Sequence, residues 1–408
     1  MAGSRTVDEA TASATTWLAK FAKLLIAGNS ADAANMFAVE CYWRDLLSFT
    51  WNIKTMEGHL AIVAMLDSQL AAIEPKSFAL EGKAKRVDGT IEAWFVFETG
   101  RARGRGHLRL ERGRCFTLLT TMTELIGHEE PIGVRRATGI EHRANHNRQS
   151  WLEQRQQEEM QLGHLHQPWC LVIGGGQGGI MLGARLRQLG VATIIIEKNA
   201  RAGDSWRRRY HSLVLHDPVW YDHLPYIPFP ENWPVFTPKD KMGDWLEMYA
   251  RVMELNYWSS TECISAAYDK EAAEWRVTVR RDGREIVLRP KHLVFATGSY
   301  GPPSEIKIMG AERFSGTQYH SSKHQTAAPW RGKKAIVVGA SSSAHDICAD
   351  LWENEAASIT MIQRSATTVV SSETLMQVAF ADLYSQEAVQ SGMTTEMADL
   401  VFASQPSD

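Results

Sequence analysis

Apolar positions in the first 128 residues recur at helical spacing and then alternate. Two helical faces are indicated, one formed by Ala10, Ala14, Trp17, Leu18, Phe21, Leu24 and Leu25, and one by Leu60, Val63, Leu66, Leu70 and Ile73. Alternating apolar positions follow at 91–97, 108–110 and 116–118, and the turn sequences Asp88-Gly89 and Arg112-Gly113 separate them. Helices followed by antiparallel strands predict an α+β domain over residues 1–128.

The character of the chain changes after this region. Residues 129–166 are rich in arginine and glutamate, which predicts a polar, partly helical linker that lies over the surface of the next domain. From residue 167 on, short apolar runs alternate with helical patterns, as in α/β domains. A strand–glycine loop–helix pattern occurs twice there, near residue 170 and near residue 335.

The first of these patterns predicts a dinucleotide site. The apolar run Cys170-Leu171-Val172-Ile173 suits a buried parallel strand, and the loop after it contains GxGxxG with glycines at 174, 176 and 179. Gly174 permits the tight turn, Gly176 lets the backbone approach a pyrophosphate, and Gly179 lets the next helix pack closely on the strand. That helix presents its free N–H groups to the phosphates.

An acidic residue follows at the expected place. The next predicted strand, 192–196, ends in Glu197, close to the spacing of about 20 residues at which an acid accepts hydrogen bonds from the ribose hydroxyls. An acid at this point disfavours a 2′-phosphate. The site therefore suits FAD or NAD rather than NADP.

The second pattern is less regular. A predicted strand at 334–338 leads into Gly339-Ala340-Ser341-Ser342-Ser343-Ala344, in which only the first glycine of GxGxxG is present. The strand after it, 358–362, is followed by Arg364 rather than an acid, and arginine suits a 2′-phosphate because its guanidinium is cationic and bidentate. We therefore predict NADPH here, with Gly339, Ser341, Ser342, Ser343, Ala344, Arg364 and Ser365 as candidate ligands. The alternative is a degenerate βαβ unit with a solvated arginine.

Composition narrows the function classes. The 408-residue chain has a formal net charge of −3, which favours neither nucleic acid nor an anionic membrane as a partner. The five cysteines are too far apart for a CxxC motif or a metal-ligand pattern, so no metal site is expected and reduced thiols predict a cytoplasmic protein. No apolar stretch approaches 18 residues, and residues 1–15 show no signal pattern.

Four further segments resemble the class B flavin-containing monooxygenases. The sequence 203–207 resembles the GGxW element that follows their first βαβ unit, and 215–250 resembles their active-site segment, particularly in the YUCCA-like branch. The run 293–298 ends in ATG, the second fingerprint of their FAD domain. Residues 314–324 match FxGxxxHxxx, although His324 stands where the family has Tyr, Phe or Trp.

The resemblance implies an α/β fold with two Rossmann-like domains. The FAD domain is expected at 167–310, discontinuous and without its C-terminal part, and an incomplete NADP domain at 311–408. The implied FAD ligands are Gly174, Gly176, Gln177, Gly178, Gly179, Glu197, Lys198, Asp204, Trp206, Thr297 and Gly298. His320 would link the two nucleotide domains. His216 matches the place of a polar residue near the flavin edge, with a structural loop histidine as the equal alternative.

The implied function is an FAD- and NADPH-dependent monooxygenase that transfers one oxygen atom of O2 to a small organic substrate through a flavin peroxide. The alternative is a truncated, non-catalytic flavoprotein fragment. A flavin disulfide reductase would need a close cysteine pair, and a plain NAD dehydrogenase would need only one dinucleotide site.

The order of elements in residues 1–128 resembles the NTF2-like family of α+β cones, with Trp43-Arg44-Asp45-Leu46 and Trp51 after the early helices. Such cones serve as docking or dimerisation modules, which makes a homodimer an expectation, or they enclose a ligand pocket. Asp45 and His59 are the polar candidates for such a pocket.

Overall fold

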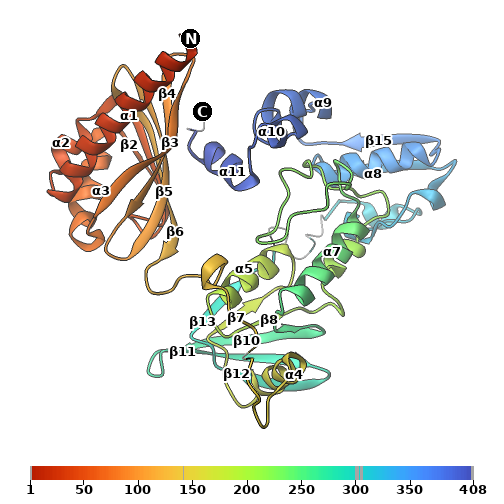
Figure 1. The fold of residues 1–408 in the computed structure, drawn as a ribbon. Coiled ribbons are helices and arrows are strands. Elements are labelled where there is room, and N and C mark those ends of the chain that lie inside the picture. The colour runs from red at the N-terminus through yellow and green to blue at the C-terminus, as the bar shows by residue number, and fades with distance from the viewer. Residues whose placement is uncertain (1, 141, 299–302, 304–306, 406–408) are drawn as a thin grey trace. The chain divides into compact units, whose positions relative to one another are not determined.

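The computed structural model describes residues 2–140, 142–298, 303 and 307–405, with side chains from Glu9 onward. The chain forms two compact units. The first consists of Met1–Arg136 together with Phe380–Asp408, and the second of Ala137–Ala379. Figure 1 shows the elements of both units.

The first unit is an α+β domain, as its sequence pattern predicts. Helices α1 (Ala2–Ile26), α2 (Ser30–Ala34) and α3 (Gly58–Ile73) lie on one face of a six-stranded sheet of order β2-β1-β6-β5-β4-β3 (Figure 1). The strands are β1 (Phe37–Leu46), β2 (Ile53–Glu57), β3 (Ser77–Val87), β4 (Thr90–Glu98), β5 (Ala102–Glu111) and β6 (Arg114–Leu125). Only the β1–β6 pair is parallel. The alternating runs of the sequence fall in β4, β5 and β6.

Aromatic side chains fill the space between the helices and the sheet. Phe21, Phe37, Trp43, Phe49 and Phe95 are almost completely buried, and the Trp43 and Phe49 rings lie 5.0 Å apart in an edge-to-face contact. Burying a side chain of this size contributes roughly 1.5–3 kcal/mol each. The core of this unit is therefore a packed interior of large side chains.

Both polar candidates of this unit have structural partners. The buried Asp45 carboxylate accepts hydrogen bonds from the amides of Phe49 (3.0 Å) and Thr50 (2.8 Å) and from the Thr120 hydroxyl (2.7 Å). His59 Nε2 lies 2.8 Å from the carbonyl oxygen of Ala38, to which it donates. Asp45 thus holds the loop after β1, and His59 ties α3 to that strand.

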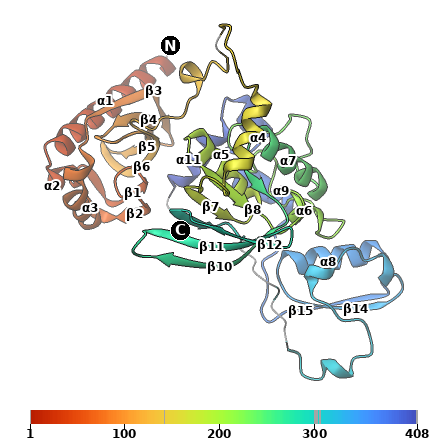
Figure 2. The same ribbon diagram turned by 90° about the horizontal axis from the view of Figure 1, so that it is seen from below.

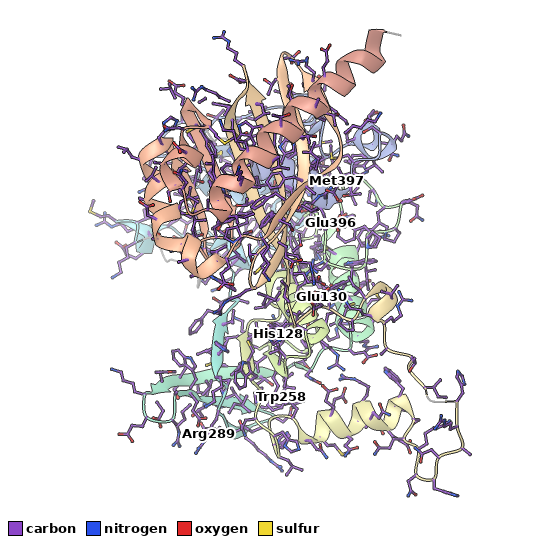
Figure 3. All side chains as sticks on the ribbon, turned by 60° about the vertical axis from the view of Figure 1, so that its left-hand side comes forward. His128, Glu130, Trp258, Arg289, Glu396 and Met397 are labelled. Atoms are coloured by element: carbon purple, nitrogen blue, oxygen red, sulfur yellow. The ribbon has the colours of Figure 1, made fainter. Side chains whose placement is uncertain are left out.

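The C-terminal segment packs with the first unit, so the prediction that residues 311–408 form one domain is wrong at its end. Arg109 lies on β5 between the core residues Leu108 and Leu110. Its guanidinium donates to the Ser404 carbonyl (3.1 Å) and hydroxyl (2.9 Å). Helix α11 (Thr395–Ala403), on which Figure 3 labels Glu396 and Met397, leads into this contact. The helical pattern of the tail is visible in the sequence, but the partner of a helix is not.

The second unit is built on a parallel sheet of order β13-β7-β8-β9. Its strands are β7 (Cys170–Ile173), β8 (Thr193–Ile196), β9 (Tyr257–Trp258) and β13 (His292–Phe295), and helices α5 (Gln177–Gln188) and α7 (Lys239–Val252) pack on it. Strands β10 (Thr261–Asp269), β11 (Glu274–Arg281) and β12 (Arg284–Leu288) form an antiparallel sheet. Strands β11 and β12 form a hairpin that turns at Asp282-Gly283.

A separate βαβ element completes this unit. Strands β14 (Lys334–Val338) and β15 (Ser358–Ile362) pair in parallel, and helix α8 (Ser342–Glu353) packs along them, as Figure 2 shows. The side chains of Ala335, Val337 and Ile359 face the helix. The other face exposes Ile336, Val338 and Ile362.

The end of the predicted linker belongs to the second unit. Helix α4 (Trp151–Gln161) begins with a capping box formed by Ser150 and Glu153. Glu158 accepts hydrogen bonds from Arg187 of α5 (2.8 Å) and from Asn256 (2.8 Å), so α4 lies on the α/β part as the sequence predicts. Leu162, just after α4, is buried in the same core as Leu171, so the polar linker ends before residue 166.

The Glu158 contact predicts a pH-dependent stability. Burial by itself raises the pKa of the Glu158 carboxyl, but hydrogen bonds and charge from Arg187, Asn256 and Arg155 outweigh it and lower the pKa to about 2. A carboxyl with a lowered pKa stabilises the folded state above its ordinary pKa of about 4.3, and this contribution is lost as the pH falls toward 2. Glu158→Gln should therefore destabilise the second unit at pH 7 and hardly at all near pH 2, as measured by urea unfolding across that range. The exposed neighbour Glu159→Gln is the control, and a Glu158→Gln effect that is constant with pH would contradict the prediction.

Candidate functional site

The loop after β7 has the geometry of a dinucleotide cradle. Gly174 has a φ of +108°, and a Cβ there would lie 2.3 Å from the Ala296 carbonyl oxygen, next to β13. A Cβ at Gly179 would lie 2.0 Å from the Gly174 carbonyl oxygen, whereas one at Gly176 would have no atom within 4 Å. The first and third glycines are required by close packing, and the second leaves open space at the loop, which is what a pyrophosphate needs.

The open part of the loop adjoins the start of α5. Gly176 is the N-cap of this helix and supplies no side-chain hydrogen bond to its first turn. Gln177 and Gly178 are exposed there. The first-turn N–H groups of α5 are therefore available to an anionic ligand, as the sequence predicts.

Glu197 reaches the same loop from the end of β8. Its carboxylate is buried and accepts hydrogen bonds from the amides of Gly175 (2.9 Å) and Asn199 (2.9 Å) and from the Asn199 side chain (2.7 Å). An ionised carboxylate offers about four acceptor positions, so it retains capacity for a ribose hydroxyl. The structure thus brings the predicted acid to the predicted loop.

Tyr257 is a loop contact that the sequence did not reveal. Its hydroxyl donates to the Gly175 carbonyl oxygen at 2.9 Å, and a Cβ at Gly175 would lie 2.2 Å from that hydroxyl. Burial, together with the charges of Glu197 and Asp204, raises the pKa of Tyr257, so the phenol stays protonated and remains a donor. It therefore fixes the turn from the β9 side.

The segment after β8 approaches the loop through Trp206. Helix α6 (Asp204–Arg207) carries this residue, and its Nε1 donates to Gln177 Oε1 at 3.3 Å. Asp204 is buried beside Arg207, with 3.1 Å between carboxylate and guanidinium, and also accepts from the amide of Arg201. Trp206 is thus placed at the cradle, while Asp204 stabilises the segment that carries it.

The remaining predicted FAD ligands are accessible. Thr297 and Gly298, directly after β13, are exposed, and the Ala296 amide before them donates to the Ile173 carbonyl oxygen at 2.8 Å. The ATG run therefore passes beside the glycine loop. Lys198 is exposed next to Glu197.

The second loop reproduces the same plan with alanine in place of the third glycine. Gly339 has a φ of +150°, and its amide donates to the Ile362 carbonyl oxygen at 3.0 Å. Ala344 is buried, and its Cβ would lie 3.4 Å from a Cβ at position 339, an ordinary contact. Alanine thus permits the tight packing of α8 that the sequence predicts.

The polar candidates of this second loop are at the surface. Ser341 is the N-cap of α8, and Ser341 and Ser342 are exposed while Ser343 is partly buried. Arg364 and Ser365 are exposed just beyond the end of β15, which adjoins β14. The cation predicted to select a 2′-phosphate therefore stands at the carboxyl edge of this small sheet.

The two fingerprint histidines have different surroundings. His320 Nδ1 accepts from the amide (3.1 Å) and hydroxyl (3.0 Å) of Ser322, a local contact. His324 is buried, with Nε2 2.8 Å from Asp350 Oδ2 of α8 and Nδ1 3.1 Å from the Tyr319 hydroxyl. The contact to the second nucleotide element is thus made by the residue that departs from the family pattern. The linking role of His320 stays a prediction.

His216 also contacts α8. Its Nε2 lies 3.2 Å from Asp346 Oδ2, and the same oxygen accepts a hydrogen bond from the buried Tyr210 hydroxyl. Burial and the neighbouring Asp346 raise the pKa of Tyr210 to about 12, so this phenol donates at neutral pH. Sequence patterns contain no signal for Asp346, Asp350 or Tyr210 as partners.

One further acid in the predicted active-site segment is perturbed. Burial, with a smaller contribution from Asp217, raises the pKa of Asp222 to about 7. Its Oδ2 is buried and has no hydrogen-bond partner in the described part of the chain. Asp222 therefore changes charge near neutral pH.

A cavity of about 510 Å³ lies elsewhere in the second unit. It is lined by Glu158, Arg187, Thr193 and Asn256 among others, at the C-terminal end of α5. The predicted cofactor residues do not line it. Over the described ranges, no cluster of His, Cys, Asp and Glu side chains could hold a metal ion, and none of the described helices has both the length and the apolar character needed to cross a membrane.

Two strand–glycine loop–helix elements lie within one unit, and each has the arrangement with which dinucleotide-binding domains begin. The profile of the family described as Pyridine nucleotide-disulphide oxidoreductase matches residues 171–379, half of the chain. The chain belongs to this family.

Similar proteins include monooxygenases of plants. The chain is 32% identical over 207 residues to indole-3-pyruvate monooxygenase YUCCA1 of Oryza sativa subsp. japonica, covering 50% of each protein. It is 31% identical over 210 residues to indole-3-pyruvate monooxygenase YUCCA6 of Arabidopsis thaliana, again covering 50% of each. The chain thus spans about half the length of the curated relatives it matches.

Among solved structures, a flavin-containing monooxygenase from Stenotrophomonas maltophilia is similar, with 26% sequence identity and a TM-score of 0.44. The match covers 51% of this chain and 62% of that one.

Proposed function

We propose that the chain is a monooxygenase that uses FAD and NADPH to transfer one oxygen atom of O2 to a small organic substrate. The observation that carries the proposal is the pair of glycine loops, the first closed by Glu197 and the second followed by Arg364. The names of the relatives, indole-3-pyruvate monooxygenases, support this class of reaction. The substrate itself is proposed only as a small organic molecule.

Different residues would bind FAD and NADPH. The Gly174–Gly179 loop and the first turn of α5 would hold the FAD pyrophosphate, Glu197 the ribose, and Trp206 the segment beside the loop. The Gly339–Ala344 loop and Arg364 would hold NADPH. The chemistry supplied by bound FAD is hydride acceptance from NADPH followed by activation of O2. What the chain adds is position and exclusion of water.

The family name also includes disulphide oxidoreductases, but a disulphide reductase fits this chain less well than a monooxygenase does. The matched region contains only Cys263 on β10 and Cys348 on α8, and neither forms a disulfide. Burial raises the pKa of both thiols, which disfavours a reactive thiolate.

A second candidate function is a non-catalytic fragment that acts through its first unit. The exposed apolar face of β14 and β15, with Ile336 61% exposed, favours it because such a face is normally covered. Aromatic side chains fill the core of the first unit, which favours a docking module of the NTF2-like type, and with it a homodimer. A ligand pocket in that core is disfavoured.

Reduction of bound flavin separates the two candidates. The purified chain should be yellow, should lose its flavin absorbance when NADPH is added without oxygen, and should regain it on aeration. A chain that cannot be loaded with FAD would refute the monooxygenase proposal. A chain that takes up FAD but is not reduced by NADPH would support the fragment.

Coenzyme choice provides a sharper prediction. Arg364→Ala should raise the KM for NADPH about tenfold to hundredfold, because a charge-assisted bond to the 2′-phosphate is worth roughly 1.5–3 kcal/mol. The KM for NADH should change less than twofold. Arg313→Ala, which removes an arginine that is also exposed in this unit, is the matched control. Equal losses for both coenzymes would remove Arg364 from the phosphate site.

A further inference from the structure

Helix α8 carries two aspartates one turn apart that face other segments of the second unit. Asp346 accepts from Tyr210 and lies 3.2 Å from His216, both in the segment that follows α6. Asp350 accepts from His324 (2.8 Å) and from the Ala327 amide (2.8 Å). Because residues at i and i+4 share one helical face, both carboxylates act on the same side of α8.

The two anchored segments are also tied to each other. The His211 amide donates to the Gln325 carbonyl oxygen at 2.8 Å, and the rings of Tyr210 and His324 lie 6.2 Å apart. Three segments therefore meet at this face of α8. One follows the FAD-binding βαβ unit, one is the fingerprint segment, and one is the helix that begins at the second glycine loop.

Burial makes these contacts costly to break. The side chains of His324 and Asp350 are 1% and 7% exposed, and Tyr210 is 4% exposed. Such groups must be hydrogen-bonded, since an unpaired buried donor or acceptor costs roughly 1–3 kcal/mol. The contacts at Asp346 are more accessible, with half of the His216 side chain exposed. At the Asp350 end both partners are buried, whereas at the Asp346 end Tyr210 is buried and His216 is half exposed.

We propose that Asp346 and Asp350 are positioning residues that fix the second glycine loop relative to the FAD-side segment, and so set the distance over which NADPH delivers its hydride. The second half of this inference rests on the proposed function. Hydride transfer requires reacting atoms about 3–3.5 Å apart, so a displacement of α8 by about 1 Å is enough to slow it strongly. Neither aspartate needs to touch a cofactor for this role.

The docking itself is tested on the full chain without added cofactor. Amide hydrogen exchange is measured for Asp346→Ala, Tyr210→Phe, the double variant, and Glu353→Ala, which removes an exposed acid from the end of the same helix. Asp346→Ala should speed exchange about tenfold in peptides containing 208–216, because the His211 amide lies in that joint. Tyr210→Phe should add little to Asp346→Ala, since both substitutions remove the Tyr210–Asp346 hydrogen bond. Glu353→Ala should exchange as the wild type does, and unchanged exchange in Asp346→Ala would overturn the proposal.

The consequence for hydride transfer is tested by anaerobic stopped-flow reduction of the FAD-loaded variants. Asp346→Ala should lower the limiting rate of flavin reduction about tenfold while the Kd for NADPH changes less than twofold, because the phosphate loop is intact. A general loss of structure would change both. A limiting rate equal to that of Glu353→Ala would refute the positioning role. If the wild type is not reduced at all, the proposed function fails, and the exchange data still decide whether the aspartates dock α8.

Discussion

Gly174→Ala should give a chain that folds its first unit normally but retains no FAD. The substitution places a Cβ 2.3 Å from the Ala296 carbonyl oxygen, at a residue whose φ is +108°. Backbone in this region costs an L-residue roughly 1–2 kcal/mol, and overpacking against backbone adds roughly 1–3 kcal/mol. Since the only relief is a shift of the loop or of the chain after β13, the pyrophosphate cradle is lost. We expect the affinity for FAD to fall at least about thirtyfold, which is about 2 kcal/mol.

The measurement is the visible absorbance of flavin that remains with the protein after gel filtration. Gly190→Ala is the matched control, because Gly190 also has a positive φ (+71°) but a Cβ there would have no atom within 4 Å. This control isolates backbone strain from the clash and should retain FAD. A Gly174→Ala protein that is as yellow as the wild type would show that the cofactor is bound elsewhere.

The geometry of the first glycine loop was predictable because its parts are contiguous. Strand, glycine loop, helix, second strand and acid all lie between Cys170 and Glu197, so local patterns are sufficient to identify them. The bond between the Gly175 amide and Glu197 spans 22 residues. Tyr257 contacts the same loop from 82 residues away, and no local pattern indicates such a partner.

The separation of partners along the chain also explains why other contacts were not predicted. Tyr210 and Asp346 are 136 residues apart, and Arg109 and Ser404 are 295 apart. Hydrophobic periodicity identifies a helix such as α11 but does not say which sheet receives it, so the domain predicted for the tail is the wrong one. Strand β3 escapes prediction for a different reason, because two exposed lysines and one exposed arginine in its second half obscure the alternation.

Asp350→Ala should produce the largest loss of stability in the second unit. The carboxylate accepts from His324 and the Ala327 amide at one oxygen and from the Asn354 side chain (3.0 Å) at the other, and it is almost completely buried. Its removal leaves the His324 ring nitrogen and the Ala327 amide without this acceptor, while the Asn354 side chain keeps the backbone carbonyl oxygen of residue 350 (2.8 Å). Each buried donor left unpaired costs roughly 1–3 kcal/mol, so two of them are a large part of the stability of an ordinary domain.

The loss is measured by urea unfolding with probes in both units, because a two-unit chain need not unfold in one step. The transition of the first unit should be unchanged and serves as the internal control. His324→Phe, which keeps an aromatic ring but removes both ring nitrogens, should cost less, roughly 1–3 kcal/mol, because Asp350 keeps the Ala327 amide and Asn354 as donors. If Asp350→Ala lowers the free energy of unfolding no more than His324→Phe does, the Asp350 carboxylate is not the centre of this network. Asp346 and Tyr210 then contribute most to holding α8 in place.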